Sequence, residues 1–180
     1  MPRIMITSDT HFGHKRIIDY GRDADFENKI LESFKELTSD DILIHLGDVC
    51  IGQDARFNEL FKSLPCKCVL VKGNHDGKTL TFYSKYWDFV CDEFMLRFHG
   101  LNILFSHKPR KKRSNIDLNI HGHLHVLDRF NNRTEDGVVV DDEFGFEYDL
   151  KYHKLISLEA NDYKLSNLKN ICDVQSVEKK

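Results

Sequence analysis

The sequence predicts an α/β fold in which a mainly parallel sheet is flanked by helices. Three short apolar segments of strand length occur in the first half of the chain, and two segments with helical spacing of apolar residues separate them. This alternation is typical of a parallel sheet, because parallel strands need a crossover connection that is usually a helix. At 180 residues the chain is long enough for one domain with a substantial core.

The first half is predicted to form a βαβαβ unit. Its strand segments are apolar runs that end at polar or glycine-containing clusters, and its helical segments place apolar side chains three or four positions apart. The second helical segment ends at Pro65. We expect strands at residues 4–7, 42–46 and 68–71, and helices at residues 25–37 and 54–64.

The second half is predicted to contain mostly strands. Residues 93–99 and 101–106 flank the pair His99-Gly100 and predict a hairpin. Further strands are expected at residues 116–120, 138–140 and 155–158, and a polar loop at residues 127–137. We assign residues 1–160 to one domain and residues 161–180 to a C-terminal tail that is either packed or mobile.

Composition excludes several classes of protein. The apolar runs are strand-sized, far short of a membrane-spanning helix, and the N-terminus lacks an apolar stretch of signal-peptide length. We therefore expect a cytoplasmic protein without membrane contact. The net charge of −3 does not indicate a nucleic-acid-binding surface over the whole molecule. The five cysteines are an odd number without a C-x-x-C pair, so no disulfide framework is expected.

Polar clusters follow the predicted strands of both halves. The carboxyl ends of parallel strands lie side by side, and open α/β proteins bind their ligands there. Two carboxylates, one amide and several imidazoles should therefore meet at one edge of the sheet. The residues at these strand ends are Asp9, His11, Asp48, Asn74, His75, His107, His123 and His125.

Oxygen and imidazole ligands without a thiolate suit hard and borderline divalent ions. Asp9 and His11 are two positions apart, so on an extended chain both side chains point the same way and can bind one ion together. The strand ends offer more ligands than one ion needs. Two ions bridged by one carboxylate, about 3.5–4 Å apart, would use them economically.

The same spacing does not by itself decide between three histidines in the second half. His121, His123 and His125 all fall on one face of an extended chain. Gly122 favours His123 and His125, because a glycine lets the chain bend into a loop where both rings turn inward.

Taken together, these motifs resemble the calcineurin-like metallophosphoesterase family. The chain carries five blocks of that family in order: Asp9-x-His11, Gly47-Asp48, Gly73-Asn74-His75-Asp76, His107 and Gly122-His123-x-His125. Residues 8–15 also resemble a subgroup of small, single-domain bacterial and phage members. The resemblance implies a four-layer α-β-β-α sandwich, in which two mixed sheets are flanked by helices.

The resemblance also implies a role for each matched position. Two divalent ions would activate water for attack on phosphorus. We expect these ions to be Mn²⁺, with Fe²⁺, Ni²⁺ or Zn²⁺ as alternatives. His75 would protonate the leaving group or stabilise the transition-state charge, and Asp76 would orient His75. Asp9, His11, Asp48 and His125 would hold one ion, and Asp48, Asn74, His107 and His123 the other.

The remaining histidines and one basic segment have alternative interpretations. His14 is expected either to contact a substrate phosphate or to cap the following helix. Residues 108–113 carry five basic side chains directly after His107, so Lys108 and Arg110 are candidate substrate contacts at the rim of the site. The alternative is a solvated loop. We expect His45 in the core, His99 in a turn, His121 in the core or behind the site, and His153 on the surface.

We therefore predict a metal-dependent phosphoester hydrolase. A short chain leaves no room for a large cap domain, so the site should be open to bulky substrates. This favours a phosphodiester of a nucleotide, RNA or DNA. The alternatives are a phosphomonoesterase on a small phosphorylated substrate and a metal-binding interaction module without turnover.

Overall fold

The computed structural model describes residues 2–125, 138–141 and 145–178. The predicted loop at residues 127–137 lies outside these ranges. The strands are β1 (Ile4–Thr7), β2 (Ile42–His45), β3 (Lys67–Val71), β4 (Phe89–Cys91), β5 (Glu93–Phe98), β6 (Leu101–Ser106), β7 (Leu118–His121), β8 (Val138–Asp141), β9 (Phe146–Asp149), β10 (His153–Leu155) and β11 (Ser166–Asn167). The helices are α1 (Phe26–Phe34), α2 (Asp54–Lys62), α3 (Leu80–Tyr83) and α4 (Leu168–Glu178), with 3₁₀ helices η1 (Lys15–Tyr20) and η3 (Glu159–Asn161).

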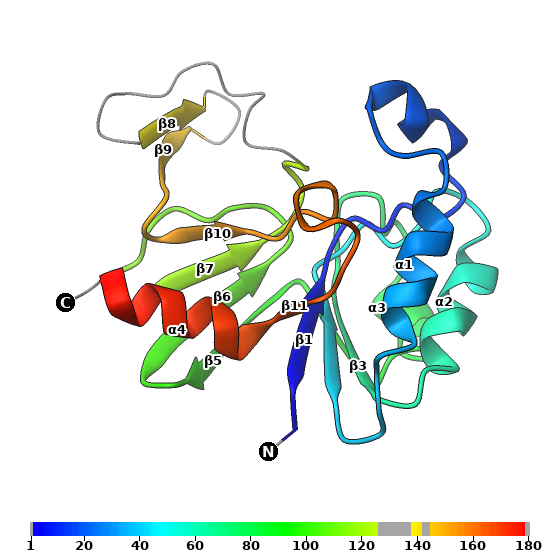
Figure 1. Cartoon of the computed structure of the whole chain (residues 1–180), viewed down its shortest axis with the longest axis horizontal. Coiled ribbons are helices and arrows are strands. Elements are labelled where there is room, and N and C mark those ends of the chain that lie inside the picture. The colour runs from blue at the N-terminus through cyan, green and yellow to red at the C-terminus, as the bar shows by residue number, and fades with distance from the viewer. Residues whose placement is uncertain (1, 126–137, 142–144, 179–180) are drawn as a thin grey trace.

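Two mixed sheets form the centre of the molecule (Figure 1). The first has the order β11-β1-β2-β3-β4, in which β1 to β4 are parallel and β11 is antiparallel to β1. The second has the order β10-β7-β6-β5, in which only the β5–β6 pair is antiparallel. The pair β8-β9 forms a separate ribbon. The predicted α/β fold of two mixed sheets flanked by helices is confirmed.

Alternation along the first sheet's strands creates two apolar cores. Met5 and Leu43 pack with the side chains of α1 and α2, whereas Ile6 and Ile44 pack with the second sheet. Successive side chains of a strand point to opposite faces, so a strand buried on both faces reads as the continuous apolar run seen in the sequence. In Figure 1, α1 and α2 lie on one side of the first sheet and β6 and β7 on the other.

Several predicted boundaries needed correction. The strand expected at residues 116–120 begins two residues later, at β7, and the one expected at residues 155–158 is β10. Ile156 still donates its N–H to the His121 carbonyl, but Leu158 has helical dihedral angles and leads into η3. The short elements α3, β4 and β11 were not predicted, since each is too short to show a periodic pattern.

The chain beyond residue 160 contributes to the structure. β11 pairs with β1, and α4 follows it directly. Leu168, Ile171 and Cys172 of α4 are buried in the core between the sheets. Of the two states considered for the C-terminal tail, these described residues adopt the packed one. Among the described residues, no helix has the length and apolar character needed to cross a membrane.

Candidate metal centre and active site

Two clusters of potential metal ligands lie at the carboxyl ends of strands from both sheets. In each cluster one carboxylate and two imidazoles present ligand atoms that all lie within 4.8 Å of one another. The residues follow β1, β2, β6 and β7, so the structure brings these strand ends together, although they belong to two sheets and not to one. The first cluster is Asp9, His11 and His125, and the second is Asp48, His107 and His123.

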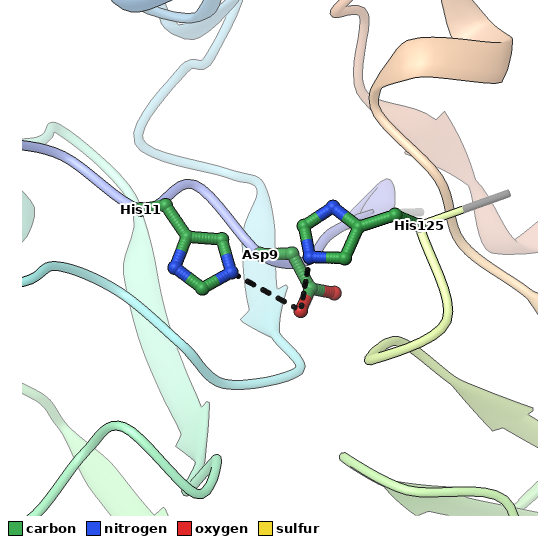
Figure 2. A group of neighbouring side chains, drawn as sticks. All are labelled: Asp9, His11 and His125. Atoms are coloured by element: carbon green, nitrogen blue, oxygen red, sulfur yellow. Dashed lines mark ion pairs between the residues drawn. The ribbon is translucent and has the colours of Figure 1, made fainter. Parts of the chain in front are cut away.

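In the first cluster two imidazoles face one carboxylate oxygen. Figure 2 shows the rings of His11 and His125 on either side of Asp9, and the Nε2 atom of each ring lies 3.8 Å from Asp9 Oδ1. The other oxygen, Oδ2, accepts hydrogen bonds from the Ser8 hydroxyl and the His123 N–H. Oδ2 therefore anchors the carboxylate and Oδ1 faces the imidazoles.

The donor atoms of this cluster fit a metal ion. Asp9 Oδ1 and both ring nitrogens of His11 are buried and have no hydrogen-bond partner among the described residues. Buried polar atoms are nearly always paired, so an unpaired group of them needs an explanation. Ligand atoms roughly 2.1 Å from a shared ion lie about 3 to 4 Å apart, which agrees with the 3.8 Å separations.

In the second cluster a backbone contact fixes the orientation of one ligand. His107 Nδ1 lies 2.7 Å from the Leu46 carbonyl oxygen, which can only accept a hydrogen bond. Nδ1 therefore carries a proton, and Nε2 is the ring nitrogen that faces the site. Nε2 lies 3.4 Å from Asp48 Oδ2 and 3.0 Å from Asn74 Oδ1, which places Asn74 beside the second cluster.

Burial and neighbouring charges set the protonation states of these groups. Burial alone lowers the pKa of His107, but Asp48 and Asp9 raise it to about 9, so a metal ion bound there would displace a proton from the ring. Burial lowers the pKa of His11 to about 3, so the ring is neutral. Burial alone raises the pKa of Asp48, but the hydrogen bond and charge of His107 bring it below its ordinary value. A neutral imidazole and an ionised carboxylate are the forms that coordinate metal ions.

The backbone at the ligands adopts an uncommon conformation. Left-handed dihedral angles are rare outside glycine, cost of order 1–3 kcal/mol each, and concentrate at functional sites. Five of the seven predicted metal ligands have them, with φ between 46° and 70°. They are Asp9, His11, Asp48, His123 and His125.

Gly122 is required for a reason other than the predicted bend. It does not have a positive φ. A Cβ atom at this position would lie 1.8 Å from Ser8 Oγ and 2.3 Å from Asp9 Oδ2. Gly122 therefore allows the loop with His123 and His125 to approach the carboxylate of Asp9.

His75 lies over the two clusters. Its Nε2 is 3.9 Å from Asp48 Oδ2, its ring centroid is 5.5 Å from that of His11, and 49% of its side chain is exposed. Its backbone N–H donates to Asp48 Oδ1 over 2.8 Å. An exposed imidazole at this position can exchange a proton with a ligand bound above the clusters.

Asp76 has a different role from the predicted one. Its carboxylate accepts hydrogen bonds from the backbone N–H groups of Asp48, Val49 and Gly73. It thus joins the loops after β2 and β3 and fixes the position of Asp48. The prediction that Asp76 orients the His75 ring is corrected accordingly.

Two charged residues behind the first cluster were not predicted. Glu159 Oε1 accepts hydrogen bonds from His125 Nδ1 over 2.9 Å and from Arg22 Nη2 over 2.5 Å. Arg22 also donates to the backbone carbonyls of Asp9 and Thr10. Burial alone raises the pKa of Glu159, but His125 and Arg22 lower it to about 2. No sequence signal identifies this pair, because 137 positions separate its members.

Of the three predicted substrate-contacting residues, one lines a hollow at the site and two are not among the described residues that line it. His14 lines a hollow of about 330 Å³ above the clusters, and its side chain does not cap η1, so the capping alternative is wrong. Lys108 and Arg110 are not among the described residues that line this hollow. Arg110 and Arg113 form ion pairs with Glu93 instead. Two of the five basic side chains of this segment are therefore paired with Glu93, away from the hollow.

Three further histidines serve the fold. His45 is buried and accepts the Gly47 N–H, as expected of a core histidine. His121 is buried and contacts the Tyr148 hydroxyl, so it belongs to the core. His153 was expected on the surface, but it is 2% exposed because its ring stacks on Tyr148, and the expectation is wrong.

Comparisons with known proteins identify the family of this chain. The sequence profile of the calcineurin-like phosphoesterase family matches residues 2–172. The uncharacterized protein MJ1445 of Methanocaldococcus jannaschii is 28% identical over 139 residues, which are 70% of this chain and 71% of that protein. The structure of AQ665 from Aquifex aeolicus, a protein of unknown function, is 28% identical with a TM-score of 0.72, and covers 97% of this chain and 100% of its own. A novel archaeal phosphodiesterase is 15% identical with a TM-score of 0.46, over 92% of this chain and 98% of its own.

The family match spans most of the chain and includes both ligand clusters. The arrangement of two mixed sheets with ligands at their strand ends is the one that the family resemblance implied. This chain belongs to the calcineurin-like phosphoesterase family and is a metal-dependent phosphoester hydrolase.

Proposed function

We propose that this chain hydrolyses a phosphodiester and that its two ligand clusters each hold one divalent cation. The observation that carries the proposal is the position of Asp48. Its Oδ2 lies 3.8 Å from His11 Nε2 of the first cluster and 3.4 Å from His107 Nε2 of the second. One carboxylate facing both clusters is what a pair of ions about 3.5–4 Å apart requires. The first ion would be held by Asp9, His11, Asp48 and His125, and the second by Asp48, Asn74, His107 and His123.

The chain's own residues would complete the chemistry. Divalent cations in these clusters would supply charge stabilisation at phosphorus and a water-derived nucleophile at neutral pH. His75 would bind the ester oxygen that becomes the leaving group and donate the Nε2 proton to it. Because its backbone N–H holds Asp48 Oδ1, the proton donor has a fixed position relative to the shared carboxylate.

The shape of the surface supports a diester over a monoester. Two hollows, of about 330 and 310 Å³, both have His75 in their walls. The first extends toward η1, and the second is lined by residues such as Ile51 and Lys78. A phosphodiester has two organic substituents and can place one on each side of His75, whereas a monoester needs only one hollow. A nucleotide or nucleic-acid ester is the substrate class we propose, with a phosphomonoester as the alternative.

We propose Mn²⁺ as the ion, since a set of carboxylate, amide and imidazole donors without thiolate suits it, although Fe²⁺, Ni²⁺ and Zn²⁺ fit the same donors. The test is turnover of p-nitrophenyl phosphate and its bis ester by chelator-stripped protein reloaded with Mn²⁺, together with metal content by mass spectrometry. We expect two bound ions per chain and faster cleavage of the diester than of the monoester. Asp48→Asn should lose both the binding of two ions and the cleavage of the diester.

Two other results would replace this proposal. Faster cleavage of the monoester would identify a phosphatase. Two bound ions without turnover of either ester would favour a metal-binding interaction module. Binding of a single ion that persists in Asp48→Asn would contradict the shared carboxylate.

A further inference from the structure

We infer that Tyr20 is the stacking platform for a nucleobase in the substrate, and that η1 forms a base-binding subsite next to the metal clusters. The inference rests on the proposed function, because the phosphate of the same ligand must be held by the clusters. It adds the group that the enzyme recognises beyond phosphorus and the residue that recognises it.

The subsite is the outer part of the larger hollow. His11, His75 and His125 of the cluster region line it together with Ile17, Tyr20 and Gly21 of η1 and its C-terminal end. A ligand that fills this hollow of about 330 Å³ therefore touches both the phosphate-binding residues and η1. The volume lies at the lower end of the range for small-molecule sites, and suits a single nucleotide better than a larger group.

Tyr20 is exposed although its surroundings are fixed. The exposed fraction of Tyr20 is 63%. Ile17 on the same 3₁₀ helix is buried in the core, and Arg22, two positions after Tyr20, is 3% exposed. Gly21 between them ends η1 in a left-handed conformation at φ 95°. Tyr20 thus presents a large aromatic side chain toward the hollow from a fixed backbone. Such a side chain suits a binding surface, because tyrosine supplies a large contact area and loses little conformational entropy on binding.

The charges that line the hollow favour a neutral ring over a second phosphate. Arg22 is the one lysine or arginine among the described residues that line this hollow. Its guanidinium is bound to Glu159 and to the carbonyls of Asp9 and Thr10, and its side chain is 1% exposed. Among the described residues that line the hollow, no cation is therefore available to a second anionic group. What the wall offers is an aromatic face and the apolar surface of Ile17, which stack with and cover a flat base.

The experiment measures binding of two ligands that differ only by the base. Dissociation constants of adenosine 5′-monophosphate and ribose 5-phosphate are determined by calorimetry with Mn²⁺-loaded protein. Base–aromatic stacking predicts that the wild type binds the nucleotide roughly 5- to 100-fold more tightly than the sugar phosphate. Tyr20→Ala and Tyr20→Leu should remove this preference and leave the binding of ribose 5-phosphate unchanged. Tyr20→Phe should keep it.

Ile18→Ala is the matched control, because Ile18 is 39% exposed on the same 3₁₀ helix and does not line the hollow. It should keep the preference for the nucleotide. The inference is overturned if Tyr20→Ala or Tyr20→Leu retains the preference, if Ile18→Ala loses it, or if Tyr20→Ala weakens both ligands equally. Failure of ribose 5-phosphate to bind the wild type would overturn the proposed metal-held phosphate itself, and the base subsite with it.

Discussion

Replacing Glu159 by glutamine should disturb the first metal site without changing any metal ligand. One carboxylate oxygen, Oε1, accepts hydrogen bonds from the Nδ1–H group of His125 and from the guanidinium of Arg22. With Nδ1 protonated, His125 presents its Nε2 lone pair to Asp9. In Glu159→Gln the amide oxygen will take the Oε1 position, because the guanidinium, the Nδ1–H group of His125 and the amide N–H₂ group are all donors. The N–H₂ group then takes the Oε2 position, and the neutral amide holds the Nδ1 proton of His125 more weakly than the carboxylate did.

The structure sets the size of both effects. Breaking a buried ion pair by removing one partner costs about 3–5 kcal/mol. The Glu159 side chain is 19% exposed and the amide oxygen still accepts hydrogen bonds, so we expect a loss of about 2–3 kcal/mol in the free energy of unfolding of the metal-free protein. Mutation of the hydrogen-bond partner of a ligating histidine typically weakens metal binding about 10- to 100-fold, and we expect that range for the first ion.

The two effects are measured separately. Urea unfolding of metal-free protein gives the loss of stability, and Mn²⁺ titration gives the affinity of each ion. Glu59→Gln is the control, since Glu59 is an exposed residue of α2 and the same charge is removed. The reasoning is refuted if Glu159→Gln binds both ions as tightly as the wild type, or if it is no less stable than Glu59→Gln.

Three further outcomes follow from the site and the core. Gly122→Ala should lose the first ion and about 1–3 kcal/mol of stability, because its Cβ would overlap the Ser8 hydroxyl. Gly77→Ala is the control, since a Cβ there meets nothing within 4 Å, and it should change neither metal binding in the titration nor stability in urea melts. His75→Ala should lower kcat by about 10²- to 10⁴-fold with an unchanged metal content; an unchanged kcat would exclude His75 as the proton donor. Burial lowers the pKa of His45 to about 3, so the unfolded chain binds a proton below about pH 6.5 that the folded protein does not. The free energy of unfolding should therefore fall by up to about 1.4 kcal/mol per pH unit as the pH decreases from about 6.5 to about 3. In urea melts at several pH values, this dependence should be steeper for the wild type than for His45→Gln. Equal dependences would contradict a neutral, buried His45.

The sequence by itself determined the central sheet and the positions of the candidate ligands. Strand and helix segments of the βαβαβ unit were visible because burial on both faces, or on one helical face, leaves a local period in the sequence. The ligand set was visible because Asp9 and His11, like His123 and His125, lie close together in the chain and directly follow strands. Local signals of this kind depend on backbone geometry over a few residues.

Only the tertiary structure decided which charges and histidines serve the site. Arg22 and Glu159 meet behind His125 because the loops after β1 and β10 approach each other where the two sheets pack. Arg110, adjacent in sequence to the site, is instead paired with Glu93 across a loop. His153 was buried by the stacking of Tyr148, which no pattern around it indicates. Contacts between residues far apart in the chain depend on how complete sheets pack, and a local pattern contains no record of that packing.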